Sequence, residues 1–175
     1  MQRLYFRADE SEFERIFEIM DISFPDNEMR TKEKQYELFT TNKHYNIFCI
    51  GDETEGILGF IVVWDLDELI FIENFATDEN ARGQGLGGEL LNFVINKYQK
   101  DVILEVEPPE DEMKRRRVGF YQRHDFIYNE FDYLMPPLRN GDEFLPLKIM
   151  SYQRTFTSES FESYKKLIYK IVYEQ

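Results

Sequence analysis

A glycine-rich stretch, Arg82-Gly83-Gln84-Gly85-Leu86-Gly87-Gly88, restricts the fold of this chain more than any other feature. A strand-like segment, Leu69 to Ala76, and a polar turn, Thr77 to Ala81, precede it. Apolar residues at helical spacing follow it, namely Leu86, Leu90, Leu91, Val94, Ile95 and Tyr98. Glycines let the backbone approach a ligand closely, and the first N–H groups of a helix carry the positive end of its dipole. This order of elements predicts a phosphate-binding turn.

Two motifs fit the glycine-rich stretch, and the first is the G-x-G-x-x-G dinucleotide fingerprint. Gly83, Gly85 and Gly88 satisfy it, and Glu105 lies about 20 residues further on, where that motif has an acidic residue. In a dinucleotide-binding fold the first glycine follows the strand directly, whereas Asp78-Glu79-Asn80 intervene here. The chain after residue 107 also lacks further alternating strand–helix units. The interpretation of this chain as an NAD-dependent oxidoreductase is therefore supported by the glycine spacing alone.

The second motif is Arg82-x-x-Gly85-x-Gly87, preceded by Glu73-Asn74-Phe75-Ala76-Thr77-Asp78. It resembles the acetyl-CoA-binding motif of the GNAT superfamily of N-acetyltransferases, whose usual form is Q/R-x-x-G-x-G/A after a strand. A second signature supports the resemblance, because residues 119–126, Gly-Phe-Tyr-Gln-Arg-His-Asp-Phe, are similar to the family's F/L-Y-x-x-x-G-F. Asp125 replaces the usual glycine, and Asp tolerates left-handed backbone angles better than most residues. Lys114 and Arg117 stand where many members have asparagine and alanine.

The expected order of strands and helices also matches the GNAT fold, from residue 2 to about 152. We expect strands at 2–7, 45–50, 57–64, 69–77, 102–106, 126–134 and 145–152. The fold class is α/β (α+β), with a central mixed, mostly antiparallel sheet of about seven strands flanked by helices, in a single domain over residues 1–175. An amphipathic helix at about 158–173 lies beyond the minimal fold. This helix could form a dimer contact, act as a lid or pack on the core of the domain.

Composition excludes some partners. The formal net charge is −13, with 34 acidic against 21 basic side chains, which argues against nucleic acid as a partner. The same charge suits a cationic acceptor, although solubility would explain it equally well. No secretory signal and no apolar run of membrane-spanning length is present, so a cytoplasmic protein without a membrane partner is expected. The single cysteine, Cys49, lies in an apolar run and is expected to be a buried structural thiol.

The resemblance implies acetyl-CoA as co-substrate and no metal. Backbone N–H groups around Phe75, Ala76 and Thr77 would hold the pantetheine arm and polarise the acetyl carbonyl, in the gap that family members open between the fourth and fifth strands. Lys114 and Arg117 would reach the phosphates of the coenzyme, or form a solvated helix face. The pyrophosphate would lie on the turn formed by Arg82, Gly83, Gln84, Gly85, Leu86, Gly87 and Gly88.

The implied reaction is direct attack of a primary amine on the thioester in a ternary complex. An alkylamine has a pKa near ~10.4 and is mostly protonated at neutral pH, so a base must accept its proton. Glu73 is the candidate base. Alternatively, Glu73 binds a cationic substrate, or it is an exposed strand carboxylate without a role in the reaction. The resemblance assigns Tyr121 the role of the acid that protonates the leaving sulfur, and a core aromatic is the alternative. His44 and His124 are weaker candidates.

The chief alternative function is a non-catalytic acyl-CoA-binding sensor or structural module of the same fold. The acceptor itself is not encoded in a recognisable motif. Acidic residues in the loops 23–30 and 136–146, which would flank its entrance, suggest a positive or zwitterionic small molecule or peptide.

Overall fold

The computed structural model describes residues 2–175 and gives a mixed α/β fold, which confirms the predicted fold class. The strands are β1 (Leu4–Arg7), β2 (Tyr45–Asp52), β3 (Gly56–Asp65), β4 (Leu69–Thr77), β5 (Asp101–Val106), β6 (Phe126–Met135) and β7 (Leu145–Tyr152). The α-helices are α1 (Phe13–Ser23), α2 (Lys32–Thr41), α3 (Leu86–Tyr98), α4 (Glu112–Arg123) and α5 (Ser158–Ile171). The seven strands follow the order β1-β2-β3-β4-β5-β7-β6.

The chain folds into two units, each packed mainly on itself. Unit 1 runs up to Asp65 and resumes from Ile72 to Gln99, and unit 2 comprises Leu66–Phe71 and Lys100–Gln175. Strand β4 is shared between them, because its first residues, 69–71, belong to unit 2 and its last, 72–77, to unit 1.

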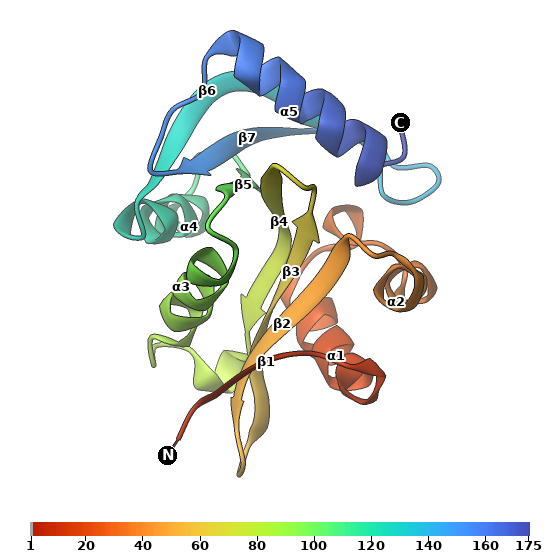
Figure 1. Cartoon of the computed structure of the whole chain (residues 1–175), viewed down its shortest axis with the longest axis vertical. Helices are drawn as coiled ribbons and strands as arrows, with labels where there is room; N and C mark the ends of the chain where they lie inside the picture. Colours follow the sequence, from red (N-terminus) through yellow and green to blue (C-terminus); the bar gives the residue numbers. More distant parts are fainter. Residues whose placement is uncertain (1) are drawn as a thin grey trace. The chain divides into compact units, whose positions relative to one another are not determined.

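Unit 1 is built on the antiparallel strands β1, β2 and β3, with β2 in the middle. Helix α3 packs on β2 and β3, while α1 packs on β3 and α2 on β2. In Figure 1, α3 lies on one side of these strands and α1 and α2 lie on the other. Because both faces are covered, β2 is buried along its whole length, with apolar residues from Ile47 to Ile50 at its centre. Cys49 is fully buried there, as the apolar run around it predicted, and burial raises the pKa of its thiol to about 12.

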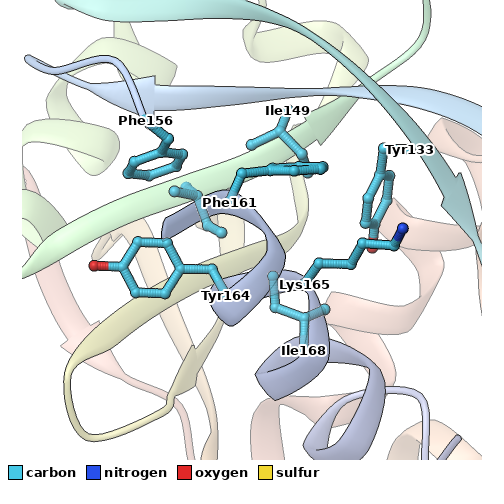
Figure 2. Close-up of a pocket in the computed structure, with 8 residues that line it drawn as sticks. Tyr133, Ile149, Phe156, Phe161, Tyr164, Lys165 and Ile168 are labelled. Atoms are coloured by element: carbon cyan, nitrogen blue, oxygen red, sulfur yellow. The ribbon is translucent and has the colours of Figure 1, made fainter. Parts of the chain in front are cut away.

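Unit 2 is built on β5, β7 and β6, with β7 antiparallel to both neighbours. Helix α5 completes its core, since Phe161 and Ile168 are 4% and 1% exposed. Phe161 also stacks on Phe131 of β6, with ring centroids 4.3 Å apart. Figure 2 shows Phe161 and Ile168 of α5 among side chains that include Ile149, and the seam between them leaves no room for a water molecule. The C-terminal helix therefore packs in the core of unit 2.

Replacing Phe161 by alanine should destabilise the protein by about 3–5 kcal/mol, because a large buried side chain is deleted from a close-packed seam. Urea unfolding followed by circular dichroism measures the change. Ser163, exposed on the same helix, provides the matched control, and Ser163→Ala should stay within about 0.5 kcal/mol of the parent. Equal stabilities for the two variants would contradict a core role for α5.

Among residues 2–175, no helix combines the length and the apolar character that crossing a bilayer requires.

Candidate active site

The glycine-rich turn adopts backbone angles that favour glycine. Gly83 and Gly85 have φ angles of 81° and 79°, in the left-handed region, which costs other residues roughly 1–2 kcal/mol. A Cβ at Gly83 would meet no atom within 4 Å, and one at Gly85 would meet only a carboxylate oxygen of Glu89, at 4.0 Å. The glycines are therefore needed for the backbone conformation, and the space beside them is left open.

The turn leads into the N-terminus of α3 without a side-chain cap. Gly85 is the N-cap residue, so no side chain accepts a hydrogen bond from the first helical N–H groups. Residues 82–85 are exposed, whereas Leu86 is 2% exposed and anchors the helix in the core of unit 1. Uncapped N–H groups, the helix dipole and open space beside left-handed glycines together fit an anionic phosphate ligand. The residues present thus suit the pyrophosphate of acetyl-CoA.

The polar segment before the glycines is held in place from two sides. The backbone N–H of Asp78 donates to the carbonyl of Leu58 on β3, at 2.8 Å. The carboxylate of Asp78 accepts from the N–H of Asn80, also at 2.8 Å, and forms an ion pair with Arg15 of α1. The hydrogen bond from Asn80 is the main reason that the pKa of Asp78 is lowered. These contacts fix the start of the turn relative to the end of β4, where Phe75, Ala76 and Thr77 are half-buried.

Glu73 on β4 is buried and fully engaged within unit 1. One carboxylate oxygen forms an ion pair with Arg30, from the loop before α2, and the other accepts from Nε1 of Trp64 at 2.9 Å. The side chains of Arg30 and Glu73 are 5% and 4% exposed, and the guanidinium lies over the Trp64 ring, 5.6 Å from its centroid. Glu73 is therefore not an exposed strand carboxylate. Nothing in the sequence marked Arg30 as its partner.

The neighbouring Asn74 has an unsatisfied buried oxygen. Asn74 is 2% exposed, and its amide nitrogen reaches the carbonyl of Glu28 at 3.5 Å. Its Oδ1 is buried and has no hydrogen-bond partner among the described residues. A buried acceptor without a donor costs roughly 1–3 kcal/mol, so a donor from a ligand or a water molecule would relieve it.

Tyr121 lies on α4 in unit 2 and is 8% exposed. Its ring makes an edge contact with Phe120 and a tilted contact with Phe126, with centroids 5.2 and 5.7 Å apart. Burial raises the pKa of the Tyr121 hydroxyl to about 12, partly offset by the positive charge of Arg117. The hydroxyl therefore stays protonated at neutral pH and keeps a proton to donate. Asp125, at the usual glycine position, has a φ of 65°, as its left-handed tolerance predicted.

Lys114 and Arg117 share one counter-ion, Glu107. The Nζ of Lys114 lies 3.2 Å from one oxygen of Glu107, and Nη1 of Arg117 lies 3.0 Å from the other. The interaction with Glu107 is also the largest cause of the raised pKa of Lys114. The Nζ of Lys114 also lies 3.8 Å from a carboxylate oxygen of Asp111 and 4.0 Å from one of Glu110, so the carboxylates outnumber the two cations in this group. Its capacity to attract phosphate is thus smaller than the two residues suggest by themselves.

Both histidines have structural contacts in their own units. Nδ1 of His44 lies 2.6 Å from the carbonyl of Asp65. His124 is the C-cap residue of α4, where its backbone N–H donates to the carbonyl of Tyr121, and its ring lies 4.8 Å from that of Phe120. Capping and ring packing account for the position of His124.

The fold and the glycine-rich turn define a protein of the GNAT type. Residues 13–126 match the family model described as "Acetyltransferase (GNAT) family". The chain belongs to this family, which confirms the resemblance found in the sequence.

Known proteins agree with this assignment. A GNAT-family chain from Bacteroides thetaiotaomicron superposes with a TM-score of 0.90 at 32% identity, covering 98% of this chain and 99% of that one. Protein YjbC of Bacillus subtilis (strain 168) is 28% identical over 174 residues, covering 86% of this chain and 88% of YjbC. Arabidopsis thaliana NAA60, solved in complex with acetyl-CoA, has a TM-score of 0.67 at 17% identity, covering 86% and 98%, and shares the fold. Acetyl transfer in general follows from the family.

Proposed function

We propose that this protein moves an acetyl group from acetyl-CoA to a primary amine, by direct attack within a ternary complex. The glycine-rich turn carries the proposal, because its left-handed glycines and uncapped helix N-terminus suit a pyrophosphate. Acetyl-CoA supplies an acyl group already activated as a thioester. Residues 82–88 hold its phosphates, and backbone N–H groups at Phe75, Ala76 and Thr77 hold the pantetheine arm and polarise the acetyl carbonyl. Lys114 and Arg117 are the proposed side-chain contacts to the phosphates, although both are already paired with Glu107.

Proton transfer defines the roles of two side chains in this proposal. Glu73 takes the proton of the acceptor amine directly or through water, or it binds the amine as a cation. Tyr121 donates the proton that the leaving sulfur requires, and its raised pKa of about 12 keeps that proton in place at neutral pH. The acceptor is a positive or zwitterionic amine, in keeping with the net charge of −13.

A kinetic test with Glu73→Gln separates the two roles of Glu73. If Glu73 is the base, turnover falls most below the pKa of the acceptor and recovers partly at high pH, where free amine is plentiful. If Glu73 only attracts the cation, KM for the amine rises and kcat survives. Steady-state kinetics from about pH 6 to about pH 10 measure both. Unchanged parameters would leave Glu73 outside the reaction.

The buried ion pair dictates the controls for this test. Removing one partner leaves a buried charge, at a cost of about 3–5 kcal/mol, so Glu73→Gln weakens the fold as well as the chemistry. The double variant Arg30→Gln/Glu73→Gln removes both charges and keeps an oxygen that can accept from Trp64. A catalytic effect of Glu73 appears in both variants, whereas an effect of the unpaired Arg30 disappears in the double variant.

The engagement of Glu73 also favours a second function, an acyl-CoA-binding module without turnover. Both carboxylate oxygens already have partners, Arg30 and Trp64, as expected of a structural ion pair. Incubation with acetyl-CoA and a mixture of amines decides between the two. An acetyltransferase releases free CoA faster than the background and adds acetyl groups that mass spectrometry detects on particular amines. A sensor binds acetyl-CoA and does neither.

A further inference from the structure

An acidic side chain lies beside the turn that is proposed to bind phosphate. Glu89 is in the first turn of α3, and one of its carboxylate oxygens lies within 4.0 Å of where a Cβ of Gly85 would be. Hydrogen bonds from Tyr5 and then from Arg3 hold the pKa of Glu89 below its ordinary value. The carboxylate is therefore charged at neutral pH, close to the same helix N-terminus that would receive the pyrophosphate.

Strand β1 and the residue before it supply the partners of this carboxylate. Arg3 forms an ion pair with Glu89 through Nη1, and its Nη2 donates to the backbone carbonyl of Gln84 within the turn, at 3.3 Å. The hydroxyl of Tyr5 donates to the second oxygen of Glu89, at 2.6 Å. The Tyr5 ring stacks on Phe93, one helical turn further along α3, with centroids 5.3 Å apart. Arg3 thus contacts both the acidic group and the turn.

Stability of the fold does not account for this arrangement. The side chains of Arg3 and Glu89 are 30% and 41% exposed, and ion pairs in such positions contribute little to stability. A carboxylate beside an anion site repels the anion, and a guanidinium paired with it cancels that repulsion.

We propose that Arg3 is a positioning residue for coenzyme recognition: it neutralises Glu89 and holds the carbonyl of Gln84, and so sets the affinity of the turn for the coenzyme phosphates. The inference rests on the proposed function, because it requires acetyl-CoA as the ligand. It assigns a role to residue 3, which lies about 80 residues before the turn and outside every motif of the sequence. The acyl and pantetheine parts of the coenzyme carry no charge, so their binding should not depend on Arg3.

Equilibrium binding of acetyl-CoA and of acetyl-pantetheine, which carries no phosphate, tests the proposal. Arg3→Gln should weaken acetyl-CoA binding about tenfold, which corresponds to about 1.4 kcal/mol, and leave acetyl-pantetheine binding unchanged. Arg3→Lys, which keeps the charge, should retain most of the affinity. The double variant Arg3→Gln/Glu89→Gln should recover most of it as well, since the repelling carboxylate is gone. Arg7→Gln removes a charge at the end of β1, where Arg7 pairs with Phe48 and not with the turn, and this variant should bind acetyl-CoA like the parent.

Three binding results would contradict the role of Arg3, and a fourth would contradict the proposed function itself. A double variant as weak as Arg3→Gln would overturn charge cancellation, and an equal loss for acetyl-pantetheine would overturn phosphate recognition. An Arg7→Gln variant as weak as Arg3→Gln would show that net charge alone is responsible, which also overturns the proposal. If the parent protein binds neither ligand, the proposed function itself fails and the role of Arg3 falls with it.

Discussion

Tyr121→Phe is expected to lower turnover by about 10²–10⁴-fold while the affinity for acetyl-CoA barely changes. The substitution keeps the ring, with its contacts to Phe120 and Phe126, and deletes only the hydroxyl. Loss of a general acid typically costs this much, because the sulfur would then leave as a bare thiolate. Steady-state kinetics on any accepted amine, paired with calorimetry for acetyl-CoA, measure the two effects separately.

The pH dependence adds a second check on Tyr121. Its pKa, raised to about 12 by burial, implies that the hydroxyl does not ionise between neutral pH and about pH 10. The pH profiles of turnover of the parent protein and of Tyr121→Phe should therefore have the same shape in this range. Tyr128→Phe removes a hydroxyl elsewhere in unit 2 and should remain fully active. Full activity in Tyr121→Phe would assign the ring to the core and leave water or substrate as the proton donor.

Gly85→Val should weaken acetyl-CoA binding by about 100-fold or more. A branched side chain at a φ of 79° strains the turn and occupies the open space beside the helix N-terminus. Losing one or two charge-assisted hydrogen bonds to phosphate, at about 1.5–3 kcal/mol each, produces a loss of this size. Calorimetry with acetyl-CoA measures the affinity, and NAD should bind to neither the parent nor the variant.

Gly141 provides a matched control for the strain. It has a φ of 93°, and a Cβ there would also meet nothing within 4 Å, but it lies in the loop between β6 and β7. Gly141→Val should lower stability by about as much as Gly85→Val, roughly 1–2 kcal/mol, without affecting acetyl-CoA binding. If both variants bind acetyl-CoA normally, the turn is not part of the coenzyme site.

Local sequence patterns predicted the elements of this protein well. The strand of residues 69–77, the turn and the helix that starts at Leu86 were all expected, because each depends on residues close together in the chain. The same is true of the left-handed backbone at Asp125, which its own short polar side chain permits. The burial of Cys49 followed from the apolar run around it.

The electrostatic partners of the candidate site residues were not predictable in this way. Arg30 meets Glu73 across 43 residues, and Arg3 meets Glu89 across 86. No periodicity or spacing links such residues, because the packing of α1, α2 and β1 against other elements brings them together. Glu107 pairs with Arg117 only ten residues away, yet the end of β5 and the start of α4 must first be in place.

The sequence by itself determined the family, the order of elements and the place of the glycine-rich turn, since glycine conformations and helix periodicity are local properties. Only the tertiary structure decided that Glu73 is buried in an ion pair, that Glu107 holds Lys114 and Arg117, and that α5 fills the core of unit 2. The physical reason is that the burial and the electrostatic surroundings of a side chain depend on which distant residues the fold brings into contact with it. The sequence does not show whether a given carboxylate faces water or a guanidinium.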